Sequence, residues 1–132
     1  MNAPKTKIKE RDEWYERAYL DLEGARLVMM QNGPDDVVAS LIQQAVEKYL
    51  KGFLISQGWE LVKTHDIELL LVECSKYQDE FGKYYDFGRL TTAFYYKHRY
   101  PPIPKPGIEP QEVVNMFHTA KKLIEYIHSV ES

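Results

Sequence analysis

Cysteine and long apolar runs are the two scarcest features of this sequence. Its one cysteine, Cys74, excludes an internal disulfide and a cysteine-based metal site, and we predict it to be a small buried hydrophobic residue. No run approaches the roughly 18–20 apolar residues of a membrane-spanning helix. The N-terminus is charged and lacks the apolar core of a signal peptide. We therefore expect a cytoplasmic protein that does not engage a membrane.

Familiar catalytic and cofactor motifs are also missing. The sequence has no glycine-rich phosphate loop, no carboxylate pair at a site-like spacing and no nucleophile beside a base motif. His118 and His128 lack partners at metal-ligand spacing, so we predict surface positions for both and neither a metal nor another cofactor. The formal net charge of −3 argues against a coat for nucleic acid or a polybasic membrane binder, but it allows a local basic patch.

The stretch from Asp36 to Gly58 is the most informative part of the chain. Its apolar residues recur at steps of three and four, a stripe wide enough to face more than one neighbouring helix. The length of 132 residues suits one domain. We therefore predict a central, largely buried helix, whose apolar stripe consists of Val38, Leu41, Ile42, Ala45, Val46, Tyr49, Leu50, Phe53 and Leu54.

Further helices are predicted around this central one, and no alternating strand pattern is found. Residues 1–8 are predicted to be a flexible tail, and residues 9–130 a single domain. Short links between helices favour antiparallel neighbours. The predicted fold is an all-α, up-and-down antiparallel bundle of about five helices, at residues 9–31, 36–58, 64–74, about 87–97 and 111–130.

Specific residues are expected to set the helix boundaries. Gly33 suits a left-handed position after the first helix. A carboxylate at Asp35 or Asp36 can cap the second helix, and Thr64 can cap the third. Five of the twelve residues from Arg99 to Pro110 are proline, which predicts an extended surface segment there.

Five residues form the candidate ligand site. Lys48 and Lys51 lie one turn apart on the central helix and would raise the local positive potential. The alternative is that they lie at the solvated edge of the helix and only shield its apolar surface with their alkyl chains. His65 precedes a helix, where unpaired amides attract an anion; it suits a phosphate contact or a general base, and also a purely local bond to the helix end. Arg99 can grip a phosphate while Tyr100 stacks on a base. Together they predict a cleft for a nucleotide or RNA phosphate, provided that the fold brings them together.

Several segments in a fixed order resemble one known family. From about Asp12 to Ile127 the chain resembles a HEPN domain. The likeness is carried by Trp14 with Ala18, Leu22 and Ala25, then SLIQQAVEKYLKGFL, THDIELLL, YYKHRYP and EPQEVVNMFHTAKKLIEYI; its most specific pieces are Gln43 to Leu54, Thr64-His65-Asp66 and Arg99-Tyr100-Pro101.

The resemblance implies a fold, partners and an activity. It implies an up-and-down helical bundle that usually forms a homodimer. Such domains are commonly encoded beside a minimal nucleotidyltransferase, often as a toxin–antitoxin pair. Many relatives are metal-independent ribonucleases, in which an arginine is followed after four to six residues by a histidine. There the histidine moves a proton at the ribose 2′-hydroxyl and the arginine stabilises phosphorane charge.

The present sequence departs from that ribonuclease motif. Its closest ordered pair is Arg89 and His98, with eight residues between them, which puts the two at a different angle around a helix. We therefore predict a non-catalytic HEPN module that binds a nucleotide or RNA phosphate, or a nucleotidyltransferase partner. One alternative is a divergent metal-independent endoribonuclease using His65 or His98 with Arg99. Another is a purely structural dimeric interaction domain.

Overall fold

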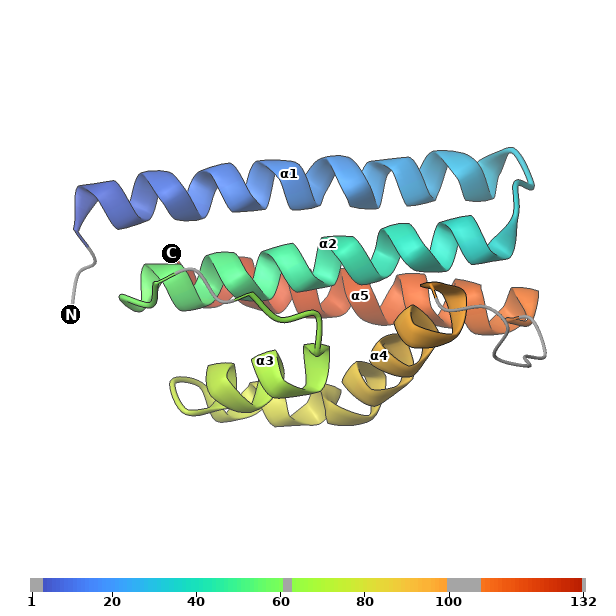
Figure 1. The fold of residues 1–132 in the computed structure, drawn as a ribbon. Coiled ribbons are helices and arrows are strands. Elements are labelled where there is room, and N and C mark those ends of the chain that lie inside the picture. Colours follow the sequence, from blue (N-terminus) through green and yellow to red (C-terminus); the bar gives the residue numbers. More distant parts are fainter. Residues whose placement is uncertain (1–3, 61–62, 100–107, 132) are drawn as a thin grey trace.

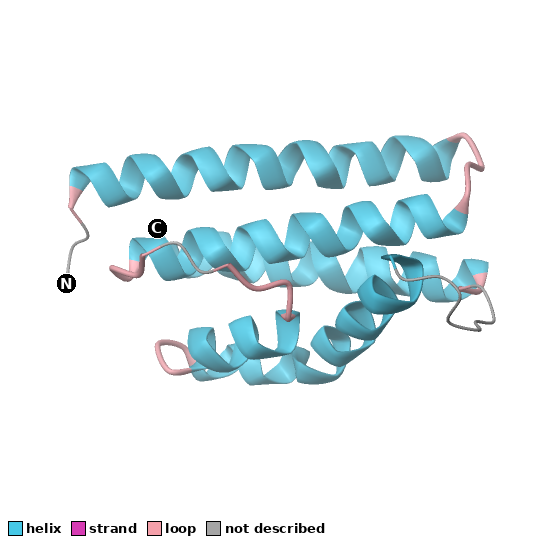
Figure 2. Cartoon of the chain, in the orientation of Figure 1, coloured by secondary structure: helices cyan, strands magenta, loops and turns pink. Residues whose placement is uncertain are grey.

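The chain folds into helices throughout the part that the structure describes. The computed structural model describes residues 4–60, 63–99 and 108–131, without the side chains of 94–99. Within these ranges there is no strand, which confirms the all-α prediction (Figure 2). The elements are α1 (Lys5–Met30), α2 (Asp35–Ser56), α3 (Ile67–Ser75), the 3-10 helix η1 (Asp79–Tyr84), α4 (Tyr85–Arg99) and α5 (Pro110–Glu131).

The helices form three layers, with α2 and α5 in the middle (Figure 1). Helix α1 lies antiparallel to α2 on one side, while α3, η1 and α4 cover the other side. Helix α5 runs in the same direction as α2, and Ser56 Oγ at the end of α2 lies 3.0 Å from Glu131 Oε1 at the end of α5. The chain is therefore a helical bundle in which α1 and α2 alternate in direction but α2 and α5 do not.

Helix α2 is the buried centre of the bundle, as predicted. Its apolar stripe contacts helices on three sides, and burying one large aliphatic side chain contributes about 1.5–3 kcal/mol. The same helix also buries the polar side chains of Gln43, Glu47 and Lys51. The apolar residues of α2 that are fully excluded from solvent are Val38, Ala39, Ile42, Ala45, Val46, Leu50 and Leu54.

The turn between α1 and α2 differs from the prediction in one residue. The left-handed position is taken by Asn32, with φ 55°, and not by Gly33. Asparagine tolerates this conformation better than most residues. Gly33 is required for space instead, because a Cβ there would lie 2.5 Å from Cγ1 of Val28. Its amide donates to the Val28 carbonyl over 2.9 Å and so closes the end of α1.

The predicted caps of α2 and α3 also need correction. Pro34 occupies the N-cap of α2, and neither Asp35 nor Asp36 caps the helix with its side chain. Both lie in the first turn, where the helix dipole stabilises negative charge. At α3 the cap is Asp66, whose carboxylate accepts from the Leu69 amide over 3.1 Å. Thr64 lies two residues before the cap, and its hydroxyl accepts a hydrogen bond from the backbone amide of Asp66.

Two helix ends also lie elsewhere than expected. Helix α1 begins at Lys5, so residues 5–8 are helical and not part of a tail. Helix α4 continues through Arg99, the first residue of the proline-rich segment, and residues 100–107 lie outside the described part. Pro110 begins α5, a position where its missing N–H costs no helical hydrogen bond.

A polar clamp fastens the end of α5 to α1 and α2. Arg11 donates to Glu131 Oε2 over 2.8 Å, and the Tyr15 hydroxyl donates to Glu131 Oε1 over 2.5 Å. Burial, reinforced by this hydrogen bond, raises the pKa of Tyr15 above its usual value. The clamp therefore holds Tyr15 as a neutral hydrogen-bond donor to the Glu131 carboxylate.

No helix in the described ranges combines the length and the apolar character needed to cross a bilayer.

Replacing Gly52 by alanine is predicted to destabilise the bundle. A Cβ at Gly52 would lie 2.6 Å from Cε1 of Tyr15 and 3.3 Å from Cβ of Trp14, so α1 would have to move. Overpacking costs roughly 1–3 kcal/mol, more than the gain of up to about 1 kcal/mol from removing a helical glycine. Urea unfolding followed by circular dichroism should show a net loss of about 1–2 kcal/mol.

Gly24→Ala is the matched control on the partner helix. A Cβ at Gly24 would lie 3.6 Å from Cδ1 of Leu41, an ordinary contact distance. This variant should be as stable as the wild type or more stable, by up to about 1 kcal/mol. Equal stability of the two variants would show that α1 and α2 tolerate a Cβ at position 52, and that the close approach of Tyr15 to Gly52 is not required for stability.

Candidate functional site

A buried carboxylate on α2 gathers three polar side chains around it. Gln43 Nε2 donates to Glu47 Oε1 over 2.9 Å, and Lys51 Nζ donates to Glu47 Oε2 over 2.9 Å. His65 Nδ1 lies 3.0 Å from Glu47 Oε1. The side chains of Lys51 and Glu47 are only 6% and 10% exposed, whereas that of His65 is 53% exposed. We call these four residues the Glu47 cluster.

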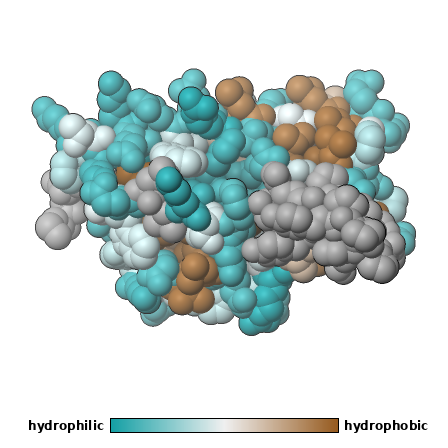
Figure 3. Space-filling view, viewed as in Figure 1, coloured by the Kyte–Doolittle hydropathy of each residue, from teal (hydrophilic) through white to brown (hydrophobic). Residues whose placement is uncertain are grey.

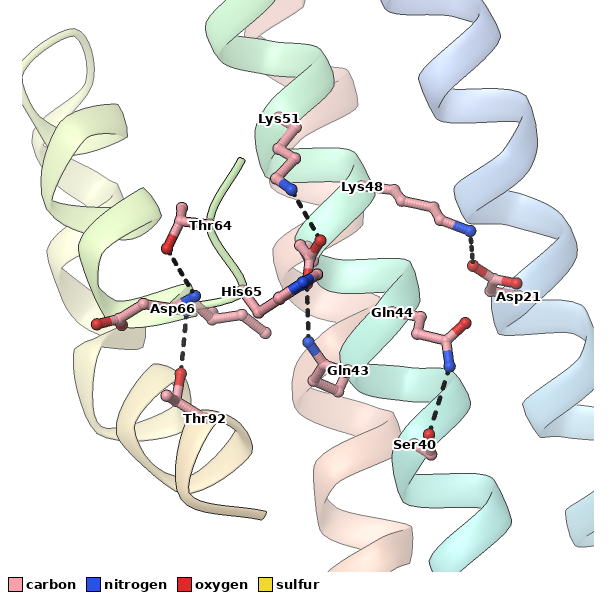
Figure 4. Close-up of polar contacts among 12 residues, drawn as sticks. Asp21, Ser40, Gln43, Gln44, Lys48, Lys51, Thr64, His65, Asp66 and Thr92 are labelled. Atoms are coloured by element: carbon pink, nitrogen blue, oxygen red, sulfur yellow. Dashed lines mark hydrogen bonds and ion pairs between the residues drawn. The ribbon is translucent and has the colours of Figure 1, made fainter. Parts of the chain in front are cut away.

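Helix periodicity and the α3 cap together place this cluster. Gln43, Glu47 and Lys51 follow one another at four-residue steps, which puts them in one row on the helix. His65 comes from the connector before α3, next to its capping residue Asp66. The connector is also fixed by α4, because the Ile67 amide donates to Thr92 Oγ1 over 3.0 Å (Figure 4).

Beside the cluster lies a surface hollow between α1 and α2. Its volume is about 340 Å³, and it is lined by Glu13, Trp14, Arg17 and Lys48. We call it the Trp14 hollow. Lys48 reaches across to α1, where its ammonium lies 2.6 Å from Oδ2 of Asp21 (Figure 4). The hollow therefore combines an indole ring, two cations and a carboxylate.

Three of the predicted ligand residues lie along one run of contacts. His65 and Lys51 share the Glu47 carboxylate, and Lys51 Nζ lies 5.8 Å from the centroid of the Trp14 ring. Trp14 and Lys48 then line the hollow together. All three basic side chains already have a carboxylate partner: Asp21 for Lys48, and Glu47 for both Lys51 and His65. An incoming anion must therefore compete with these internal pairs.

For the other predicted ligand residues, Arg99 and Tyr100, the structure describes no side chain. The α4 backbone runs through His98 and Arg99, but their side chains are not described, and neither is Tyr100. Their approach to Lys48, Lys51 and His65 stays a prediction, and so does the catalytic pairing of His98 with Arg99.

The structure also describes the surroundings of three other side chains that could be reactive, Cys74, His118 and His128. Cys74 is fully buried, and burial raises the pKa of its thiol above the usual value, so it is not a nucleophile. His118 and His128 are both exposed, as predicted. The His128 ring meets the ring of Tyr49 edge-on at 5.6 Å between centroids, and burial raises the pKa of Tyr49 to about 12. Across the described ranges, no group of three or more His, Cys, Asp and Glu residues is placed to hold a metal ion.

Reasoning from the sequence missed four residues of this region. Glu47 and Gln43 could have been found, because their four-residue spacing with Lys51 places a carboxylate within reach of the ammonium. Trp14 and Arg17 gave a weaker signal. Trp14 fitted the apolar stripe of its helix, and nothing in the sequence indicates that Arg17 faces Lys48 across a hollow.

Comparison with known protein families gives one match. The model of the HEPN domain matches residues 12–130, nearly the span over which the sequence resembles that family. Neither the curated proteins nor the solved structures contain a match to this chain.

Removing the Glu47 charge is predicted to destabilise the domain strongly. Glu47→Gln keeps the side-chain size but leaves the Lys51 ammonium, 6% exposed, without its counter-charge. Loss of one partner from a buried ion pair costs about 3–5 kcal/mol. Thermal unfolding should therefore occur roughly 10–20 °C lower than in the wild type.

The double variant Glu47→Gln/Lys51→Met is the matched control. Methionine fills much of the lysine volume without a charge, so this variant should recover a large part of the lost stability. A double variant no more stable than Glu47→Gln alone would show that the ion pair is not the source of the effect.

Proposed function

Because the chain belongs to the HEPN domain family, we propose that it is a non-catalytic HEPN module that binds a nucleotide or RNA phosphate. The observation that carries this proposal is the run of contacts that connects His65 to Lys51 through Glu47, and Lys51 to Lys48 through Trp14. Lys48 is the more accessible of the two lysines, because its side chain is 28% exposed and that of Lys51 is 6% exposed. A phosphate can exchange with Asp21 for this ammonium at small cost, since partly exposed ion pairs contribute about 0–1 kcal/mol.

The surroundings of Arg89 support a non-catalytic role. Arg89 is the first residue of the pair Arg89 and His98, whose spacing in the sequence comes closest to that of the ribonuclease motif. Its guanidinium donates to Glu68 Oε2 over 2.7 Å and to Asp86 Oδ1 over 2.9 Å. Two carboxylates therefore already occupy the group that would have to stabilise phosphorane charge.

We further propose that the chain forms a homodimer and binds a minimal nucleotidyltransferase, as one member of a toxin–antitoxin pair. Exposed apolar side chains support a protein partner, because such patches are typical of interaction surfaces. Apolar surface lies over the C-terminal half of α1 and the start of α2 (Figure 3). The exposed large apolar residues on the C-terminal half of α1 and in the first turn of α2 include Tyr19, Leu20, Leu27, Met30 and Val37.

Nucleotide binding is tested by titration calorimetry and thermal unfolding with AMP, ATP, GTP and a short RNA. At a ligand concentration of 100 times Kd, binding stabilises the folded state by about 2.7 kcal/mol, which raises the melting temperature by several degrees. Lys48→Ala should weaken binding about tenfold and make log K less dependent on log salt, because one phosphate contact is lost.

Lys121→Ala is the control for this experiment, because Lys121 is exposed on α5 and lies outside the run of contacts. It should bind like the wild type. If neither AMP, ATP, GTP nor RNA gives heat or raises the melting temperature, the chain is not a nucleotide-binding module.

A metal-independent ribonuclease is the second candidate function. The observation that favours it is the pairing of Glu47 with a histidine whose side chain is 53% exposed. A carboxylate that orients an imidazole is a common arrangement for a general base. In such a reaction His65 would take the proton from the ribose 2′-hydroxyl, and Arg99 would stabilise the charge on phosphorus.

Incubation of the purified protein with RNA in the presence of EDTA tests this candidate. If it is right, His65→Ala and Arg99→Ala should each reduce cleavage by at least a hundredfold. His118→Ala, at an exposed position on α5, should cleave like the wild type. Absence of cleavage by the wild type, or cleavage unaffected by His65→Ala, would eliminate His65 as the base.

A further inference from the structure

We infer that the Trp14 hollow is the binding site for one mononucleotide unit: a base stacked on Trp14 and a single phosphate held by Arg17 and Lys48. This inference rests on the proposed function and gives it a place and a ligand class. Of the candidate residues whose side chains the structure describes, Lys48 lines this hollow, whereas Lys51 and His65 do not. Trp14 and Arg17 were not among the candidates predicted from the sequence.

The size of the hollow limits the ligand. Its volume of about 340 Å³ is near the lower end of the roughly 300–1,000 Å³ that small-molecule sites occupy. One base with its sugar and phosphate suits this space. A dinucleotide cofactor would extend beyond the four lining residues.

The lining side chains match the parts of a nucleotide. Trp14 and Arg17 lie three residues apart on α1 and therefore share one face of the helix. An indole ring provides a flat apolar surface for a base, and base–aromatic stacking tolerates every base. A guanidinium can donate two parallel hydrogen bonds to a phosphate. Arg17 is exposed and makes no hydrogen bond or ion pair with the described residues, so its donors face solvent.

The balance of charge in the hollow selects against polyphosphates. Arg17 and Lys48 bring two positive charges, whereas Glu13 and the Asp21 that pairs with Lys48 bring two negative ones. Each added phosphate of a diphosphate or triphosphate would meet these carboxylates without a further cation. Glu13 can accept a hydrogen bond from an exocyclic amino group of a base. The preferred ligand is therefore a monophosphate whose base carries an amino group.

Lys51 supports the indole ring from the protein side. Its ammonium lies 5.8 Å from the Trp14 ring centroid and is fixed by the buried Glu47 carboxylate. A ring held in this way loses little freedom when a base stacks on it, which favours binding. The Glu47 cluster thus has a positioning role for the hollow.

Tryptophan fluorescence provides a direct test, because the chain has two tryptophans, Trp14 and Trp59. In a Trp59→Phe background, stacking of a base should quench the emission of Trp14. We expect AMP to quench it in a saturable way, ATP to bind at least tenfold more weakly, and Arg17→Ala to weaken AMP binding at least tenfold. Arg26→Ala is the matched control, since Arg26 lies on the same helix but pairs with Glu23; it should bind AMP like the parent.

A short adenine-containing RNA distinguishes the source of the mononucleotide unit. Quenching by both AMP and the RNA, or by the RNA alone, with loss in Arg17→Ala, supports the hollow. Calorimetric binding of AMP or RNA that persists in Arg17→Ala and leaves Trp14 emission unchanged overturns the hollow, while the proposed function stands. ATP binding as tight as AMP binding overturns the monophosphate preference. No binding of any nucleotide or RNA to the wild type overturns the inference and the proposed function together.

Discussion

The close contact between the Tyr15 ring and the backbone of Gly52 determines how α1 lies on α2. Any side chain at position 52 would meet this ring, at 2.6 Å for a Cβ, so the two helices approach more closely here than larger residues allow. The Tyr15 ring is buried here, and its hydroxyl reaches Glu131 on α5. The neighbouring Trp14, whose Cβ would also lie 3.3 Å from a Cβ at position 52, has its ring beside Lys51. The clamp at the end of α5 and the wall of the hollow therefore both depend on one glycine in the middle of the central helix.

The central helix combines a purely apolar stripe with one polar row, and the two have different consequences. The stripe stabilises the bundle through burial and needs no particular partner. The row needs one, because Lys51 and Glu47 are both largely withdrawn from water and each requires the other. The same pairing consumes positive charge that could otherwise face a ligand. A nucleotide bound as proposed above would meet few uncompensated cations, which favours small, singly phosphorylated groups over long polyanions.

The sequence was sufficient for the helices and insufficient for their contacts. Periodic apolar residues predicted the central helix correctly, since burial is a property of the pattern and not of a single partner. The turn residues were predicted less well: Asn32 takes the left-handed conformation, and Gly33 is needed to avoid Val28. Asp66, and not Thr64, caps α3, because both residues offer an acceptor and only the path of the connector decides between them. The pairing of Lys48 with Asp21 depends on how α1 is placed on α2, which local spacing does not specify. Arg99 and Tyr100, chosen for their residue types, lie where the structure describes no side chain.

The single cysteine has an experimental consequence that follows from its position. Cys74 lies at 0% exposure on α3, with its sulfur 3.9 Å from the Leu50 carbonyl of the central helix. A thiol reagent cannot reach it until α3 separates from α2. Because no other cysteine competes, the rate of labelling at this one atom measures how often the bundle opens between these helices. The chain thus carries a built-in reporter of its own native-state fluctuations, available without any substitution or attached dye.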